Sequence, residues 1–146
     1  MVIREMNIGD VPSIAKLETV CFSDPWSEKS IASELDNRLS YWLVAECGGA
    51  IVGYVGSQSV LDSADMMNIA VAPEYRRKGI GKMLINTLTD NLHRKGIRFL
   101  LLEVRVSNAS AIALYESLGF EQVGKRPRYY HNPREDALIL RKELGE

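Results

Sequence analysis

Residues 68–84 read NIAVAPEYRRKGIGKML, an apolar run followed by a proline and a basic turn with two glycines. The apolar run is strand-like and stops at Pro73, which lacks the N–H that a central strand needs. After Gly79 the apolar side chains recur at helical spacing, so the segment predicts a strand, a loop and a helix. A helix start carries unpaired N–H groups and partial positive charge, so this turn is a candidate phosphate site. A solvated helix start with a flexible turn explains the same residues equally well.

Two other phosphate-binding loops do not match this turn. The P-loop needs Gly-Lys-Ser/Thr after a four-residue gap, and the dinucleotide fingerprint needs three glycines at a different spacing. The pattern Arg76-x-x-Gly79-x-Gly81 instead resembles the pyrophosphate-binding motif of the GNAT acyl-CoA-dependent N-acetyltransferases. The resemblance implies that residues 76–82, which we call the cradle, receive the pyrophosphate of acetyl-CoA.

The composition is that of one folded domain. The chain has 146 residues, of which 46% are hydrophobic and 25% are charged, enough for one sizeable core and too few for two ordinary domains. No apolar run approaches the ~20 residues of a membrane span, and the charged N-terminus does not resemble a secretion signal. Cys21 and Cys47 have no partners at metal-ligand spacing and read as reduced thiols. We therefore expect a single cytoplasmic domain, residues 1–146, with neither a membrane segment nor a metal.

Charge is distributed unevenly along the chain, although its net value is only −1. Residues 1–65 carry 4 Lys and Arg against 10 Asp and Glu, whereas residues 66–146 carry 14 against 9. The asymmetry is typical of two surfaces with different partners, one cationic and one anionic. Uneven solvation of surface helices would produce the same numbers.

The flanking sequence predicts an alternating α/β order. Asp10 and Ser27 each precede helical spacing and are candidate N-caps, and Ser107 or Asn108 can cap a third short helix. The long helix is predicted over 79–95. The nearly continuous apolar run 97–106 is typical of a strand buried on both faces. Further strands are expected at 2–5, 41–46, 51–60, 66–71, 120–125 and 137–142. The order β-α-α-β-β-β-α-β-α-β-β implies a mixed sheet with one parallel crossover.

The resemblance to GNAT enzymes extends over nearly the whole chain. Residues 68–75 look like the family's cofactor-side strand, and residues 107–120 are similar to its second signature, an Asn-opened helix with a tyrosine before Gly-Phe. Residues 21–27, 102–105 and 124–130 resemble the bacterial RimI-type ribosomal-protein-alanine N-acetyltransferases. The implied fold is α/β (α+β), a mixed, mostly antiparallel central sheet with a parallel crossover and flanking helices. The departure is at residues 65–67, Asp-Met-Met, where Glu and branched aliphatic residues are expected in the wall of the substrate groove.

The resemblance also implies acetyl-CoA as co-substrate and assigns its contacts. Backbone groups of the cofactor-side strand would pair with the pantetheine amides, the cradle would hold the pyrophosphate, and Asn108 would touch the cofactor while capping its helix. The implied cofactor-binding residues are Ile69, Ala70, Val71, Arg76, Arg77, Lys78, Gly79, Ile80, Gly81, Lys82 and Asn108.

Glu103 is the candidate general base. It stands in an apolar strand, where a carboxylate is costly unless it is paired or near water. From the residues alone, an ion pair with Arg98 or Arg105 is the better explanation. The resemblance implies that Glu103 accepts the proton of the substrate amine.

Tyr115 is the candidate general acid. It follows Asn108 by seven residues, two helical turns, and a phenol can donate a proton to a departing thiolate. A tyrosine that only packs in the core is the ordinary alternative. The resemblance implies the proton-donor role.

Residues 125–134 combine basic and aromatic side chains and form the predicted substrate wall. In isolation such a loop could bind RNA through phosphates and stacking, but a sequence pI of about 6.2 argues against nucleic-acid binding. We expect Tyr129 and Tyr130, together with Trp26, to contact the substrate.

Together these features predict acetylation of a protein N-terminal amine, with the N-terminal alanine of a small-subunit ribosomal protein as the implied substrate. Transfer to a lysine side chain or a small-molecule amine, and a non-catalytic module that binds CoA or the ribosome, are the alternatives. At pH 7 roughly 10% of an α-amine is neutral, against roughly 0.04% of a lysine amine, so an α-amine needs less help from one carboxylate.

Overall fold

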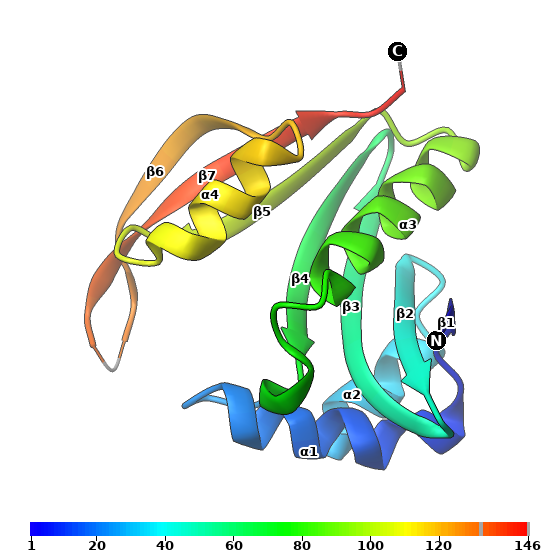
Figure 1. Cartoon of the computed structure of the whole chain (residues 1–146). Coiled ribbons are helices and arrows are strands. Elements are labelled where there is room, and N and C mark those ends of the chain that lie inside the picture. Colours follow the sequence, from blue (N-terminus) through cyan, green and yellow to red (C-terminus); the bar gives the residue numbers. More distant parts are fainter. Residues whose placement is uncertain (132, 146) are drawn as a thin grey trace.

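We describe residues 1–131 and 133–145 from a computed structural model of the chain, in which the elements follow the predicted order (Figure 1). Their bounds are β1 (Val2–Glu5), η1 (Ile8–Asp10), α1 (Val11–Cys21), α2 (Glu28–Leu35), β2 (Ser40–Cys47), β3 (Ala50–Val60), β4 (Ser63–Val71), η2 (Pro73–Tyr75), α3 (Ile80–Arg94), β5 (Phe99–Arg105), α4 (Ala109–Ser117), β6 (Glu121–Tyr130) and β7 (Glu135–Glu143).

Seven strands form one sheet in the order β1-β2-β3-β4-β5-β7-β6. Every neighbouring pair is antiparallel except β4 and β5, which confirms the mixed sheet with one parallel crossover. The parallel pairing covers only Ser63, Ala64 and Asp65 of β4 against Phe99, Leu100 and Leu101 of β5. Beyond these residues the two strands diverge, as Figure 1 shows.

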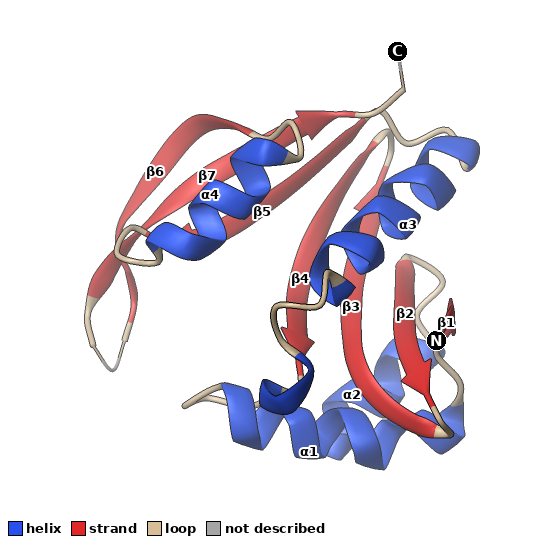
Figure 2. Ribbon diagram, in the orientation of Figure 1, coloured by secondary structure: helices blue, strands red, loops and turns tan. Residues whose placement is uncertain are grey.

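Helices cover both faces of the sheet (Figure 2). The larger core joins α3 and α4 to one face, and Leu84, Leu88, Leu100 and Leu140 are fully buried in it. The second core lies under α1 and α2 on the other face, where Ile14 of α1 and Ile31 of α2 are fully buried.

β5 was expected to be buried on both faces, and that prediction is wrong. Leu100, Leu102 and Val104 are buried beneath α3 and α4, while the residues that alternate with them are only half-buried. Side chains alternate across a strand, so the second set, which includes Glu103, lies on the opposite face. The sequence could not reveal this, because residues 99–102 are apolar on both faces of the strand, although only one face is fully buried.

The basic, aromatic segment is mostly strand and not loop. β6 continues from Glu121 to Tyr130 and pairs with β7, and the register shifts between Arg126 and Tyr130. Such a bulge re-aims the side chains of the strand that carries it. Arg128 has φ of 55°, and its N–H donates to Asp136 at 2.8 Å.

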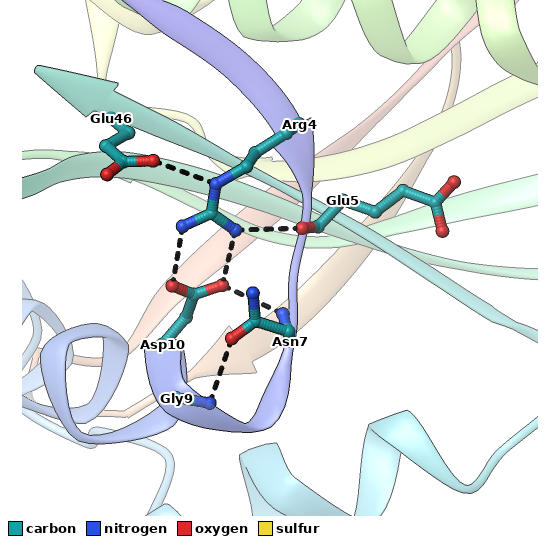
Figure 3. Close-up of polar contacts among 6 residues, drawn as sticks. All are labelled: Arg4, Glu5, Asn7, Gly9, Asp10 and Glu46. Atoms are coloured by element: carbon teal, nitrogen blue, oxygen red, sulfur yellow. Dashed lines mark hydrogen bonds and ion pairs between the residues drawn. The ribbon is translucent and has the colours of Figure 1, made fainter. Parts of the chain in front are cut away.

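Two of the three predicted helix caps form. Ser27 and Asn108 accept from the backbone N–H groups of Ser30 and Ala111, at 3.1 and 3.2 Å. Asp10 does not cap α1. Its carboxylate instead accepts from Arg4 at 2.9 Å and from the N–H of Asn7 at 2.8 Å, and Glu46 accepts from the same guanidinium (Figure 3).

Within the described residues, no helix combines the length and the apolar character needed to cross a membrane.

Candidate active site

The opening between β4 and β5 exposes a backbone edge of β4. The N–H of Ala72 donates to Val52 of β3 at 2.8 Å, and alternate residues of an antiparallel strand face the same side. Ala70 therefore faces β3, while Ile69 and Val71 direct backbone groups toward the opening. Three strand residues are predicted to meet the cofactor. Ile69 and Val71 direct backbone groups toward the opening, whereas Ala70 directs its backbone groups toward β3 and packs its side chain in the second core.

The cradle has the backbone geometry of an anion site. α3 begins at Ile80 after Gly79, whose φ is 80°, and the first helical bond runs from the N–H of Met83 to the Gly79 carbonyl at 3.0 Å. Among the described residues, the N–H groups of Ile80, Gly81 and Lys82 have no acceptor, and they point out of the helix start. The Ile80 side chain itself is buried in the core, so only its backbone is available.

The cradle side chains do not all face the helix start. Arg76 turns back, and its guanidinium donates to the Val71 carbonyl at 3.1 Å and contacts the Cys21 sulfur at 3.4 Å. Lys78 lies over the Tyr75 ring, 5.4 Å from its centroid. Arg77 and Lys82 are exposed. Arg76 thus ties the end of β4 to the cradle, a contact that sequence spacing could not reveal.

Glu103 lines a pocket of about 230 Å³ where β4 and β5 begin to separate. The side chains of Asp65 and Met67 of β4 alternate with buried core residues, so the pocket opens on the face that α1 and α2 cover. Burial raises the pKa of Asp65, and the nearby Glu103 carboxylate adds to this effect. The lining residues are Asp65, Met66, Met67, Leu101, Leu102, Glu103, Arg126, Tyr129 and Ile139.

The ion-pair partner of Glu103 is Arg126. Neither arginine named from the sequence takes this place, because Arg98 lies 4.0 Å from Asp62, and Arg105 pairs with Glu135 at 3.2 Å. The Glu103 side chain is 27% exposed, so a ligand in the pocket can reach it.

Tyr115 of α4 lies on the opposite side of the sheet from Glu103, in the larger core that α3 also covers. Its ring packs edge-on against Phe120 at 5.7 Å, and burial raises the pKa of its phenol to about 12. Its hydroxyl has no hydrogen-bond partner within residues 1–131 and 133–145. Asn108 sits at the exposed start of the same helix, where its side chain caps the backbone.

Tyr130 ends β6 and packs on β5 through Arg105. The Arg105 guanidinium lies over the Tyr130 ring, 4.4 Å from its centroid. Burial raises the pKa of Tyr130 to about 12, and the negative charge of Glu103 adds to the rise.

Of the three predicted substrate residues, Tyr129 is the one in the lining of the pocket at Glu103. Tyr129 lines the pocket, and interaction with the Glu103 carboxylate raises the pKa of its phenol. Its ring meets that of Tyr130 edge-on at 5.0 Å. Trp26 comes from the α1–α2 connection, is half-buried, and packs edge-on against Trp42 at 5.5 Å.

A larger hollow of about 510 Å³ lies between α1 and the start of β3. It contains none of the sequence-predicted site residues, and its charged side chains include Asp10 and Glu46, both of which pair with Arg4. The smaller pocket at Glu103 is therefore the better candidate for chemistry.

Sequence reasoning missed two contributors to the site. Arg126 was counted only as part of a basic loop, although its place in the motif Lys-Arg-Pro-Arg-Tyr-Tyr was a usable signal. The second is Glu18 of α1, which is buried and accepts a hydrogen bond from Asn68 of β4. The sequence alone gives no sign that this carboxylate is buried.

Comparisons with known proteins identify the family of this chain. The model of the acetyltransferase (GNAT) family matches residues 11–120. The [ribosomal protein bS18]-alanine N-acetyltransferase of Escherichia coli (strain K12) is 41% identical over 140 residues, which cover 94% of each chain. The crystal structure of the ribosomal-protein-S18-alanine N-acetyltransferase from Escherichia coli superimposes with a TM-score of 0.92 at 39% identity, over 99% of this chain and 94% of that one. The NatC complex bound to Gag peptide and CoA gives a TM-score of 0.84 at 27% identity, over 99% of this chain and 98% of that one. The chain therefore belongs to the GNAT family of acetyltransferases.

Proposed function

We propose that this enzyme transfers the acetyl group of acetyl-CoA to the N-terminal α-amine of a protein, and that this amine belongs to the N-terminal alanine of ribosomal protein bS18. The observation that carries the proposal is the pocket lined by Glu103 where β4 and β5 separate, together with the open helix start after Gly79. The names of the relatives supply the choice of bS18.

In the proposed reaction, acetyl-CoA lies along the open edge of β4. Ile69 and Val71 offer backbone groups to it, and the N–H groups of Ile80, Gly81 and Lys82 donate hydrogen bonds to its pyrophosphate oxygens. Arg77, Lys78 and Lys82 balance the phosphate charge, while Arg76 and Asn108 hold the ends of the cleft in place. The family relationship and the solved neighbour with bound CoA support this arrangement.

The peptide enters the pocket from the face covered by α1 and α2. Tyr129 forms part of its wall, and Glu103 accepts the proton of the attacking amine, directly or through one water. The amine nitrogen forms a bond to the thioester carbonyl carbon, and the carbon–sulfur bond breaks.

Tyr115 donates the proton that the departing sulfur needs, so the products are the acetylated amine and the free thiol of CoA. Because the pKa of this phenol is about 12, Tyr115 remains protonated at neutral pH. The tyrosine then regains its proton from solvent.

A peptide panel tests the proposal. One peptide carries the first residues of bS18, a second has its α-amine already acetylated but retains a lysine, and others vary only the first residue. Release of free CoA thiol should occur with the first peptide and be lost with the second, and mass spectrometry should place the acetyl group on the α-amine. Equal release with the blocked lysine peptide would indicate a lysine acetyltransferase, and no release with any peptide would indicate a non-catalytic module.

A further inference from the structure

Glu18 is a buried carboxylate that the proposed chemistry does not use. The residue, in α1, is only 1% exposed, and no lysine or arginine of the described residues forms a salt bridge with it. Burial raises the pKa of Glu18, although its hydrogen bonds oppose the rise. A buried carboxylate without a cation is costly, so its hydrogen bonds must hold it there.

Three donors from three different segments satisfy this carboxylate. The backbone N–H of Trp26, in the α1–α2 connection, donates to one oxygen at 2.9 Å. The hydroxyl of Tyr54 on β3 and the side-chain amide of Asn68 on β4 donate to the other oxygen. A single side chain therefore joins residues 22–27, which we call the α1–α2 loop, to the two central strands.

The Asn68 contact lies beside the candidate active site. The β3–β4 register shifts so that Gly56 faces Asn68 and Ser57 faces Met66, which leaves Met67 as the extra residue of a bulge. Met67 lines the pocket that holds Glu103. The Glu18 carboxylate is thus bonded to the residue next to the pocket wall, on the same face of the sheet.

Phe22 and Trp26 of the loop pack against the second core, and the Phe22 N–H donates to the Glu18 carbonyl at 2.9 Å. Pro25 precedes Trp26, and residues 23–25 are exposed. The Trp26 ring packs edge-on against Trp42, and the Trp42 ring stacks on Tyr54 with their ring centroids 5.8 Å apart. The bond from the Trp26 N–H to Glu18 is the hydrogen bond that ties the middle of this loop to the body of the sheet.

We propose that Glu18 is a positioning residue, which holds the α1–α2 loop against β4 and thereby sets the wall that receives the first residues of the peptide substrate. The structural part concerns the loop alone. The kinetic part rests on the proposed function, because it requires that the loop contacts a peptide.

The test compares Glu18→Gln with a matched control. Glutamine keeps the shape of the side chain but presents an N–H₂ group where Tyr54 and Asn68 both donate. Asp10→Asn is the control, because Asp10 is also a buried carboxylate that accepts from side-chain and backbone donors, at the opposite end of α1. The double variant Glu18→Gln with Asn68→Asp moves the carboxylate to β4 and restores a donor–acceptor pair.

Two measurements are made on each variant. Hydrogen exchange of residues 22–27, read by mass spectrometry at equal global stability, should accelerate about tenfold or more in Glu18→Gln, because the charge-assisted hydrogen bonds that hold the loop are lost. The KM for the bS18 peptide should rise by a similar factor, while kcat and the KM for acetyl-CoA move less than about twofold. Asp10→Asn should leave all four quantities near those of the parent, and the double variant should recover at least part of the loss.

The outcomes separate the two parts of the argument. Unchanged exchange in residues 22–27 of a folded Glu18→Gln protein would overturn the positioning role, whatever the kinetics. Faster exchange without a change in peptide KM would overturn the kinetic role. If the parent enzyme releases no CoA thiol with any peptide, the proposed function fails, and the exchange data still decide whether Glu18 holds the loop.

Discussion

Arg126 on β6 reaches across β7 to pair with Glu103 on β5. The two residues are 23 positions apart and lie on strands that are not neighbours in the sheet. On β7, the strand between them, Ile139 pairs with Glu103 of β5 on one side and with Gly124 of β6 on the other. An amine that used Glu103 as its base would have to compete with this guanidinium for the carboxylate.

Replacing Glu103 by glutamine distinguishes a base from an ion-pair partner. If Glu103 is the base, Glu103→Gln should lower kcat by about 10²–10⁴-fold while acetyl-CoA still binds. Arg126→Gln breaks the same ion pair and keeps the carboxylate, so it is the control. The pair is partly exposed, at 57% and 27% for the two side chains, and so should contribute at most about 1 kcal/mol to stability. Equal loss of turnover in both variants would leave Glu103 without a catalytic role of its own.

Tyr115→Phe removes one oxygen and leaves the packing against Phe120. We expect kcat to fall by about 10²–10⁴-fold, because the departing sulfur loses its proton donor, while the KM for acetyl-CoA changes little. Rapid-quench kinetics should verify that the chemical step limits turnover. A variant that turns over within about twofold of the parent would make Tyr115 a packing residue.

The raised pKa of Tyr115 also predicts how stability depends on alkaline pH. The phenol has a pKa of about 12 in the folded chain, against an ordinary value of 10.0. Its burial therefore contributes fully below about pH 10, and that contribution is lost as the pH rises toward 12. Urea unfolding of the parent should weaken over this window by about 2–3 kcal/mol more than unfolding of Tyr115→Phe. Parallel curves for the two proteins would contradict the burial of an ionisable phenol here.

The cradle is tested at Gly81. A Cβ added there would meet nothing nearer than the Val71 side chain at 3.9 Å, so Gly81→Val should fold, yet its branched side chain would cover the helix start. We expect the KM for acetyl-CoA to rise about tenfold or more, measured by free-thiol release at saturating peptide. An unchanged KM in the folded variant would argue against phosphate binding at this turn.

Gly79 needs a different control, because its φ of 80° disfavours any side chain. Gly96, just after α3, has φ of 88° and is equally open. Gly79→Ala and Gly96→Ala should each cost roughly 1–2 kcal/mol of stability. Only Gly79→Ala should also weaken acetyl-CoA binding.

Asp10 supplies a prediction for acid. Burial opposes its ionisation, but hydrogen bonds from Arg4 and from the Asn7 N–H outweigh burial and lower the pKa of Asp10. Its contribution is therefore present above the ordinary pKa of 3.8 and is lost as the pH falls through the folded value. Asp10→Asn should cost about 2 kcal/mol at pH 7 and less at pH 3, by urea unfolding. A cost that does not shrink in acid would contradict the pairing in Figure 3.

The order of elements, the cradle and two helix caps followed from the sequence because each depends on short-range chemistry. Apolar spacing sets strand and helix within about ten residues, Gly79 meets the demand for a positive φ before α3, and the Ser27 and Asn108 side chains reach N–H groups three residues away. The family motifs lie in the same local stretches. Asp10 is the exception, because Arg4 and Asn7 compete for its carboxylate.

Only the tertiary structure decided which charges and phenols meet. Arg126 reaches Glu103 across β7, which lies between β5 and β6, and Arg105 of β5 packs over the ring of Tyr130 at the end of β6. Glu18 meets Asn68, 50 residues away, because a second bulge turns that amide toward α1. Strand order, register and bulges arise from the whole packed sheet, and no local window of sequence carries them.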